Sequence, residues 1–276
     1  MLGGNVMEEQ PMALDRMKDK VAIVTGAAPR GDGLGNGMAC AMMFAQEGAK
    51  VVLVNRKREK ADALAEKIRA DGGEAHVITC DVTDKDQVEA MVAETMDKYG
   101  RLDVLHNNAG IGGGGGLEKT DLPGWHKVIG LNMTGVMLCC QAAVPAMRAG
   151  GRGGSIINIS SIAGATGLLR ESGGALAYTA TKAGLHGITM SVAADYAREQ
   201  IRANTLVVGS VYTPMVAHQG EEARQRRAKM VPLQNEGTAW DVAYAATFLA
   251  SEESRWITGI ALPVDGGLLS TNIWPA

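Results

Sequence analysis

Short runs of β-branched and apolar residues alternate along this chain with longer stretches of helical periodicity. This alternation is typical of parallel strands, because a strand needs a long crossover connection to return to the same edge of a sheet. The strands are almost continuously apolar, which indicates a sheet that is covered on both faces. We expect strands at residues 21–24, 51–54, 76–80, 102–106, 156–159, 204–208 and 260–264. The sequence therefore predicts an α/β fold, with a doubly wound, parallel, seven-stranded sheet and helices on both faces.

Two of the connecting helices can be located from their periodicity and end signals. Between residues 61 and 68, apolar side chains recur at i, i+3, i+4 and i+7, and Gly72-Gly73 follows where such a helix would end. Thr83 and Asp86 resemble a capping box, so a second helix should begin there and stop near Gly100.

Charge and composition argue against several classes of function. The formal net charge is -3 and no basic stripe is visible, which disfavours nucleic acid and anionic membranes as partners. The first twenty residues lack the apolar stretch of a secretory signal, and no run elsewhere looks long enough to span a bilayer. The histidines and cysteines have neither metal-ligand nor disulfide spacing. We therefore expect a cytoplasmic protein without a metal.

A glycine-rich turn, TGAAPRGDGLGNG, directly follows the first predicted strand and leads into a helix. Glycines let the backbone approach a pyrophosphate, and a helix amino end offers unpaired N–H groups and a favourable dipole to negative charge. A merely flexible turn has the same composition, so the signal depends on its place between a strand and a helix. In that setting the turn predicts a dinucleotide site.

The glycines that approach the dinucleotide can be inferred by counting. About three helical turns before the second strand place the helix start at Gly35-Asn36-Gly37, with Gly26 as the first glycine. This turn resembles that of the short-chain dehydrogenase/reductase family, which reads Thr-Gly, three residues, then Gly-x-Gly. Here eight residues separate Gly26 from the pair, so Gly31 and Gly33 stay open as alternative close-approach glycines.

The same resemblance extends over nearly the whole chain. It is carried by NNAG at 107–110, Asn132, the strand that ends in Ser161, YTATK at Tyr178–Lys182, and DGG at 265–267. It implies a Rossmann-type fold and a catalytic tetrad of Asn132, Ser161, Tyr178 and Lys182. Each of these residues alone has an ordinary structural explanation, such as a strand-end cap or a solvated lysine. Their joint occurrence in this order favours the catalytic interpretation.

The resemblance also implies a role for each member of the tetrad. Tyr178 would be the general acid or base, because a phenolic proton of pKa about 10 becomes usable near neutrality beside a cation. Lys182 would supply that cation and bind the nicotinamide ribose. Ser161, rather than Ser160, would hydrogen-bond the substrate oxygen, since the family's serine stands three residues before a glycine. Asn132 would position a water that links Lys182 to solvent as a proton relay.

The predicted cofactor is a nicotinamide dinucleotide, with NADP favoured and NAD as the alternative. The residues expected to bind it are Gly26, Arg30, Gly35, Gly37, Asn55, Arg56, Asp81, Val82, Asn108, Ala109, Gly110, Tyr178, Lys182, Val211 and Thr213. NAD sites normally carry a carboxylate where this chain has Asn55, and Arg56 follows with a guanidinium suited to a 2′-phosphate. Arg30 could add a second contact, whereas Lys57 and Arg58 also fit a solvated first helical turn.

Two departures from the family pattern fall near the expected substrate mouth. Sixteen residues separate Ser161 from Tyr178, more than the family usually shows, so this loop should reshape the mouth. Val208 stands before Gly209 where the family commonly has proline, which should make the turn beneath the nicotinamide less rigid. Thr213 should still hydrogen-bond the carboxamide.

These observations predict an NAD(P)-dependent oxidoreductase that interconverts a secondary alcohol and a ketone. A small hydrophobic or alicyclic substrate is favoured by the mostly apolar residues expected at its pocket, which are Leu168, Leu169, Tyr212, Met215 and Val216. One alternative is a non-catalytic NAD(P)-binding regulator, against which the complete tetrad argues. Another is an epimerase or dehydratase on the same fold, which usually carries an added substrate domain. Enoyl reductases of related fold space their tyrosine and lysine more widely.

The length of the chain fits one large domain. No linker interrupts the strand and helix rhythm, and the glycine run at 112–116 fits a mobile loop better than a boundary. We predict a flexible N-terminal extension over residues 1–18 and a single dinucleotide-binding catalytic domain over residues 19–276. The resemblance implies a homotetramer, with small residues at 180–187 and an apolar stripe at 133–140 as helix-contact faces. Ordinary core packing would explain both faces equally well.

Overall fold

The computed structural model describes residues 14–28, 31–113, 115–167 and 174–271. The main elements are β1 (Val21–Thr25), α1 (Asn36–Gln46), β2 (Lys50–Asn55), α2 (Arg58–Ala70), β3 (Glu74–Thr79), α3 (Lys85–Tyr99), β4 (Val104–Asn107), α4 (Leu122–Ile129), α5 (Gly135–Gly150), β5 (Gly154–Ser161), α6 (Leu176–Tyr196), β6 (Ile201–Val208), α7 (Pro214–Ala217), α8 (Gly220–Met230), α9 (Ala239–Ala250) and β7 (Ala261–Val264). The shorter elements are η1 (Leu117–Lys119), the π-helical segment η2 (Gly130–Thr134), η3 (Ile162–Gly164), η4 (Ala197–Glu199) and η5 (Glu252–Ser254).

Within the described residues, seven strands form one parallel sheet in the order β3-β2-β1-β4-β5-β6-β7. The predicted doubly wound, seven-stranded sheet is confirmed. The strand order reverses at β1 and β4, which pair with each other although their helical connections leave on opposite faces of the sheet. Ligands of such folds bind in the crevice beyond the carboxyl ends of these two strands.

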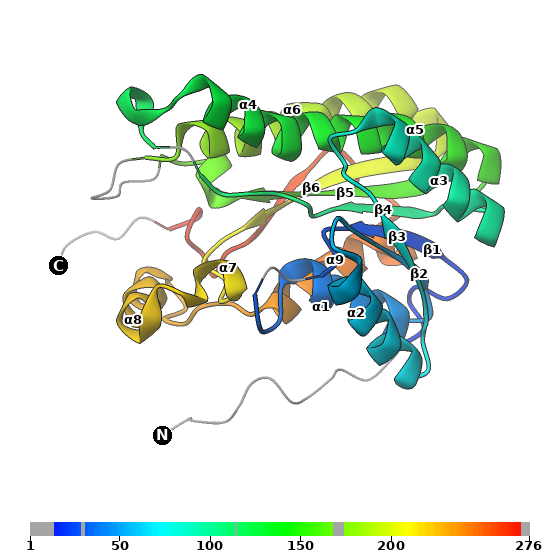
Figure 1. Ribbon diagram of the computed structural model, residues 1–276, viewed down its shortest axis with the longest axis horizontal. Coiled ribbons are helices and arrows are strands. Elements are labelled where there is room, and N and C mark those ends of the chain that lie inside the picture. Colours follow the sequence, from blue (N-terminus) through cyan, green and yellow to red (C-terminus); the bar gives the residue numbers. More distant parts are fainter. Residues whose placement is uncertain (1–13, 29–30, 114, 168–173, 272–276) are drawn as a thin grey trace.

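Helices cover both faces of the sheet (Figure 1), and each face has its own core. Along β1, Ala22 and Val24 pack toward α1, α2 and α9, whereas Val21 and Ile23 pack toward α3, α5 and α6. Every residue of β1 is buried for this reason. The two-sided burial explains why the strands are apolar throughout rather than alternating with polar residues.

Helix α1 packs on the sheet and, on the same face, against α9, which comes near the end of the chain. Eight of its eleven residues are buried, from Gly37 to Ala45. The facing side of α9 is built from small and aliphatic residues, including Ala243 and Ala246, which lets the two helices approach closely. The helix that begins at the glycine-rich turn is therefore held on both sides.

One predicted helix cap is wrong by one residue. Asp84, not Thr83, is the N-cap of α3, and its carboxylate accepts hydrogen bonds from the backbone N–H groups of Asp86 and Gln87 at 3.0 and 3.2 Å. The hydroxyl of Thr83 instead donates to Asp81 at 2.8 Å. Both residue types cap helices well, so the pattern alone did not separate them. The predicted end near Gly100 is confirmed, with a φ of 71°.

The expectation that no stretch is long enough to cross a bilayer needs correction. Helices α4 and α5 are joined through η2 into one helical stretch, Leu122–Gly150, which passes the length and composition test for a membrane span. Half of the most apolar part of this stretch is buried inside the fold, as is typical of a core helix. The π-helical segment η2 connects the end of α4 to the start of α5, so the two helices form one continuous stretch.

Part of the predicted extension packs against the domain. Met17 is fully buried, and the backbone N–H groups of Leu14 and Arg16 donate to the Glu47 carboxylate at 3.0 and 3.1 Å. Residues 1–13 lie outside the described residues, so a flexible extension stays a prediction for them. The glycine run is also anchored, because Gly115 accepts a hydrogen bond from the backbone N–H of Leu176 at 3.1 Å.

Candidate active site

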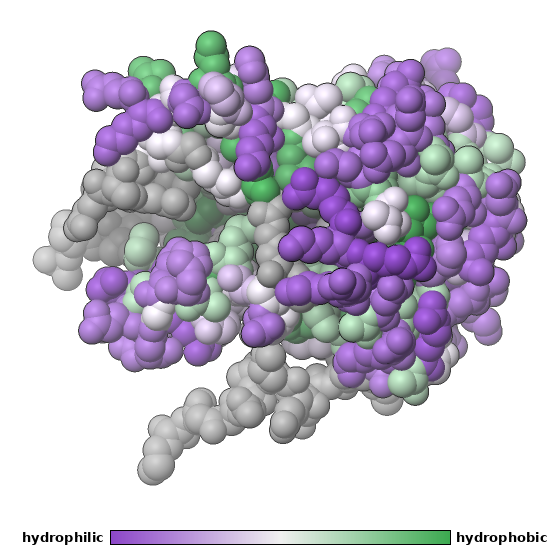
Figure 2. All heavy atoms as spheres, viewed as in Figure 1, coloured by the Kyte–Doolittle hydropathy of each residue, from purple (hydrophilic) through white to green (hydrophobic). Residues whose placement is uncertain are grey.

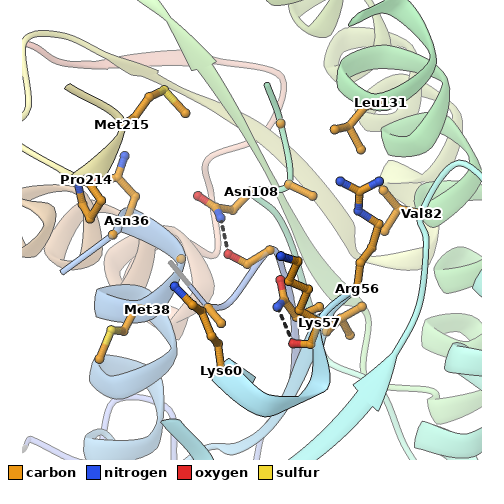
Figure 3. Close-up of a pocket in the computed structure, with 18 of the residues that line it drawn as sticks. Asn36, Met38, Arg56, Lys57, Lys60, Val82, Asn108, Leu131, Pro214 and Met215 are labelled. Atoms are coloured by element: carbon orange, nitrogen blue, oxygen red, sulfur yellow. Dashed lines mark hydrogen bonds between the residues drawn. The ribbon is translucent and has the colours of Figure 1, made fainter. Parts of the chain in front are cut away.

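A cavity of about 670 Å³ opens beyond the carboxyl ends of β1, β2 and β4 (Figure 3). Ten of the predicted cofactor residues line it: Gly26, Gly35, Gly37, Asn55, Arg56, Val82, Asn108, Ala109, Gly110 and Thr213. Asp81, Val211, Tyr178 and Lys182 are not among the lining residues, and Arg30 lies outside the described residues. Lining residues that were not predicted to bind the cofactor are Ala28, Asn36, Met38, Val54, Lys57, Lys60, Cys80, Gly112, Leu131, Pro214 and Met215.

The glycine-rich turn fits a dinucleotide because its backbone is packed too closely for side chains. A Cβ on Gly37 would lie 2.4 Å from both the Asn108 Nδ2 and the Gly26 carbonyl oxygen. Gly26 has a φ of +63°, and a Cβ there would lie 2.9 Å from the Ala109 Cα. Asn108 Nδ2 donates to the Gly26 carbonyl at 2.9 Å, which ties the turn to β4. The backbone can thus face a pyrophosphate directly at the amino end of α1.

The alternative pair of glycines is placed differently. A Cβ on Gly31 would lie at an ordinary distance of 3.5 Å from the Pro214 side chain. Gly33 has a φ of +104°, so glycine suits its conformation, but its nearest neighbour is 3.7 Å away. These contacts favour Gly26 and Gly37 as the close-approach glycines.

Three basic side chains gather where β2 meets α2. Arg56, Lys57 and Lys60 all line the cavity, and Figure 3 shows Lys57 between the other two. Asn55 Nδ2 donates to the Lys57 carbonyl at 2.7 Å, which holds this corner. Cations at a helix amino end run against the helix dipole, so three of them there are a signal for an anionic ligand. That signal could have revealed Lys60 from the sequence.

Asp81 supports this basic corner from outside the cavity. It accepts hydrogen bonds from Thr83 and forms a 3.4 Å ion pair with Arg56, whose side chain is 62% exposed. Partial burial raises the pKa of Asp81, but the Thr83 hydrogen bonds and the Arg56 charge outweigh it and lower the pKa overall. Asp81 therefore stays ionised and orients Arg56. Cys80 lines the cavity as a thiol, since burial, with the charges of Asp81 and Asp84, raises its pKa to about 11.

Lys182 and Tyr178 face each other on α6. The Lys182 Nζ lies 5.6 Å from the centroid of the Tyr178 ring and donates to the Ile159 carbonyl at 2.6 Å. Only 5% of Lys182 is exposed, and this burial lowers the pKa of its ammonium group from 10.5 to about 8. The four-residue spacing thus brings a buried cation beside a tyrosine ring.

Asn132 joins this pair to the cavity wall. It lies in the π-helical segment, is fully buried, and both accepts from and donates to the backbone of Ile111 at 2.8 Å. Its Nδ2 also lies 3.3 Å from the Thr181 hydroxyl. A Cβ on Gly110, which lines the cavity, would lie 3.3 Å from Asn132 Oδ1 and 3.7 Å from Lys182 Nζ. Asn132 and Lys182 therefore stand directly behind Gly110.

The two serines at the end of β5 have different environments. Ser160 is buried and its hydroxyl donates to the Lys182 carbonyl at 2.7 Å, a bond that fixes α6 against the sheet. Ser161 is half-buried, and its hydroxyl oxygen accepts from the Ala163 N–H at 3.2 Å. A Cβ on Gly164 would lie 2.5 Å from the Lys182 carbonyl carbon, so glycine lets η3 pack on α6. Ser161 is the better candidate for contact with a substrate.

Among the described residues, no group of three or more His, Cys, Asp and Glu side chains could hold a metal ion. A metal-free reaction stays a prediction.

Comparison with known proteins agrees with this geometry. A family model described as enoyl-(acyl carrier protein) reductase matches residues 30–269. A crystal structure of a short-chain dehydrogenase/reductase from Burkholderia xenovorans superposes with a TM-score of 0.87 at 39% identity, covering 94% of this chain and 99% of the other. This chain belongs to the short-chain dehydrogenase/reductase family.

Named relatives share nearly the full length. The 2,5-dichloro-2,5-cyclohexadiene-1,4-diol dehydrogenase LinX of Sphingobium indicum is 38% identical, over 92% of this chain and 97% of its own. The trans-4-hydroxycyclohexanecarboxylate dehydrogenase of Sinomonas cyclohexanicum is 39% identical, over 94% and 96%. The 3-oxoacyl-[acyl-carrier-protein] reductase FabG of Thermotoga maritima is 38% identical, over 92% and 99%.

These relatives confirm the predicted enzyme class. The chain is an NAD(P)-dependent oxidoreductase that interconverts alcohols and ketones. The family model matches from within the glycine-rich turn to beyond the terminal DGG, so it includes most of the residues that line the cavity.

Proposed function

We propose that this short-chain dehydrogenase/reductase oxidises a secondary alcohol, or reduces the matching ketone, with Tyr178 as its general acid or base. The observation that carries this proposal is the pairing of a buried Lys182 ammonium with the Tyr178 ring, directly behind the Gly110 wall of the cavity. A cation in that position stabilises a phenolate, which lets tyrosine exchange a proton near neutral pH.

Each residue would contribute a separate step. The bound nicotinamide supplies or accepts the hydride. Tyr178 takes the alcohol proton in oxidation and returns it in reduction. Ser161 donates a hydrogen bond to the substrate oxygen, which holds that oxygen beside the tyrosine. Asn132 keeps Ile111 and α6 in register, and the predicted proton relay from Lys182 to solvent passes beside it.

NADP is the proposed cofactor. Asn55 brings no charge that would repel a 2′-phosphate, and Arg56, Lys57 and Lys60 all line the cavity with positive charge. Arginine suits phosphate geometry, and the lysines add point charges. Arg30, predicted as a further contact, lies outside the described residues and does not support this proposal.

The proposed substrate is a small alicyclic alcohol or ketone. Two relatives are dehydrogenases of a cyclohexadiene diol and of a hydroxycyclohexanecarboxylate. In this chain Met215 lines the cavity, and Tyr212 stands partly exposed beside Thr213. Leu168 and Leu169, also expected at the pocket, lie outside the described residues.

A 3-oxoacyl thioester is the second candidate substrate, favoured by the likeness to FabG. The enoyl reductase description of the family model is less apt, because Tyr178 and Lys182 are spaced by four residues rather than more widely.

A spectrophotometric screen tests both candidates. Cyclohexanols, cyclohexanones and acetoacetyl thioesters are offered with NADP(H) and NAD(H), and absorbance of the reduced cofactor is followed. We expect turnover of alicyclic compounds with NADPH. Turnover of thioesters alone would replace the substrate, and binding of cofactor without any turnover would leave only a nucleotide-binding regulator.

We also propose a cytoplasmic homotetramer. On the predicted faces, Val136 and Cys140 are buried and Met133 packs against Gly184, so part of each face is ordinary core. Met137 and Met190 remain 42% and 57% exposed on α5 and α6. Light scattering should return about four times the chain mass of 28.9 kDa; the mass of a single chain would refute the tetramer.

A further inference from the structure

Helix α8 follows α7, whose first residues line the cavity, but α8 is not anchored by apolar packing. None of its residues, Gly220–Met230, is buried, and its sequence GEEARQRRAKM is dominated by charge. Figure 2 shows a hydrophilic surface over this helix. An isolated helix of this length is marginal in water. Something other than a hydrophobic face must hold α8 in place.

The anchor is the carboxylate of Glu236, a residue outside the helix. Its side chain is only 3% exposed, yet it contacts two arginines of α8. The Arg227 Nε lies 2.5 Å from Glu236 Oε1, and the Arg224 Nε lies 3.7 Å from Oε2. A carboxylate this buried must be paired, because an unpaired charge out of water is strongly unfavourable.

Glu236 also reaches the wall of the cavity. The Ser210 hydroxyl donates to Glu236 Oε1 at 3.0 Å. The next residue, Gly237, donates its N–H to the Ser210 carbonyl and accepts from the Tyr212 N–H, both at 2.9 Å. The Arg224 guanidinium stacks 4.2 Å from the centroid of the Tyr212 ring. One buried carboxylate therefore connects α8 to Ser210–Tyr212.

The segment that follows is part of the cavity. Thr213, Pro214 and Met215 line it and lead into α7. Because Glu236 holds the Ser210 hydroxyl and pairs with the arginine that stacks on Tyr212, the same carboxylate contributes to the position of this wall. We propose that Glu236 is a positioning residue that latches α8 and the Thr213–Met215 wall closed over the substrate side of the cavity. This goes beyond the proposed function, and depends on it only for the identity of the bound molecules.

The proposal predicts a loosened wall without damage to the chemistry. In Glu236→Gln the two arginines lose their buried counter-charge, so α8 should open more often and the bound substrate should be held less well. Trypsin can cut α8 after Arg224, Arg226, Arg227 and Lys229. We expect cleavage there to become about tenfold faster, since proteolysis follows local opening. We expect KM for the alcohol to rise about fivefold with kcat within about twofold.

A matched control is Glu222→Gln. Glu222 is 92% exposed and pairs only at 3.8 Å with Arg226, so its loss should change neither readout. If Glu236→Gln and Glu222→Gln have the same cleavage rates, the latch is overturned. If cleavage accelerates while KM stays unchanged, the positioning of the wall is overturned.

If Glu236→Gln does not fold, as the lack of a cooperative unfolding transition would show, Arg227→Gln tests the same proposal. Glu236 then still faces Arg224 and Ser210, and the control Arg226→Gln removes one trypsin site from the same helix. Faster cleavage and a raised KM in Arg227→Gln alone support the proposal, and equal behaviour of the pair refutes it. The cleavage assay needs no turnover, so an inactive parent would refute the proposed function without touching the latch.

Discussion

The two ends of the cavity are built in opposite ways. At the glycine-rich end, buried strands and close backbone contacts leave no room, so that even one Cβ on Gly37 would collide. At the substrate end, the wall continues into α8, which has no buried residue and is held by ion pairs. The rigid glycine-rich end suits one ligand, the dinucleotide, whatever the substrate. The second can change its residues without disturbing the core, which suits an enzyme family whose members differ in substrate.

The largest effect should come from the group that carries the proton. Tyr178→Phe removes the hydroxyl but keeps the ring beside Lys182, so cofactor binding and folding should persist. Loss of a general acid or base should lower kcat by about 10²- to 10⁴-fold. Tyr244→Phe, on α9 with 44% exposure, is the control and should behave as the parent. Substantial activity in Tyr178→Phe would refute the mechanism.

A glycine pair tests whether the first end is as tight as the contacts indicate. Gly37→Ala places a methyl group 2.4 Å from the Gly26 carbonyl oxygen and the Asn108 amide. Overpacking of this kind should lower the free energy of unfolding by about 1–3 kcal/mol and weaken cofactor binding. Gly31→Ala, with 3.5 Å to Pro214, should stay within about 0.5 kcal/mol of the parent. Denaturant titration of both variants measures the contrast; equal losses would contradict it.

Cofactor choice sharpens the comparison at the basic corner. Arg56→Ala removes one charge-assisted phosphate contact, which should cost NADP about 1.5–3 kcal/mol, or roughly one to two decades in kcat/KM. Asn55→Asp should shift preference toward NAD. Arg58→Ala is the control, because Arg58 is equally exposed, pairs with Asp62 and does not line the cavity. A parent that prefers NAD, with Arg56→Ala neutral toward NADP, would show the assignment to be wrong.

The smallest effect concerns the stability cost of the buried cation. Burial lowers the pKa of Lys182 from 10.5 to about 8 in the folded state. Below pH 8 the lysine is charged in both states, so its burial destabilises the fold. Between pH 8 and 10.5 the folded state releases the proton first, and stability contributed by this residue rises with pH. Relative to Lys182→Met, the parent should be less stable by about 1–3 kcal/mol at pH 7, and the gap should shrink above pH 8.

Thermal unfolding of the parent and of Lys182→Met at pH 7 to 10 measures this difference. Lys85→Met, on the exposed side of α3, supplies the control with no expected trend. A gap between parent and Lys182→Met that is constant with pH would contradict the assigned burial effect.

The sequence predicted the glycine-rich end well because its constraints are local. The strands, Gly26 and Gly37 follow from two-sided burial and from the spacing of a turn before a helix. The same reasoning did not include Lys60, although basic residues gathered at the amino end of a helix were a signal for an anionic ligand. It chose Thr83 over Asp84 because adjacent capping residues satisfy the same pattern.

The substrate end escaped prediction for a different reason. Helix α8 has no apolar stripe, so periodicity could not reveal it or indicate its orientation. The buried Glu236 looks like any surface glutamate in sequence, and its partners Ser210 and Arg227 are brought to it only by the fold. The long helical stretch through Asn132 was likewise hidden, because a π-helical segment has no sequence signature as clear as a cap.

The packing of α1 against α9 also has a consequence during synthesis of the chain. The helix that opens the glycine-rich cradle leaves the ribosome early, but its cover, residues 239–250, is among the last parts to be made. Until then the apolar residues of α1 around Phe44 can pack on the sheet and α2 but not on α9. A nascent chain stopped before α9 would therefore expose apolar surface. At this stage the chain would be most prone to aggregation and most in need of chaperones.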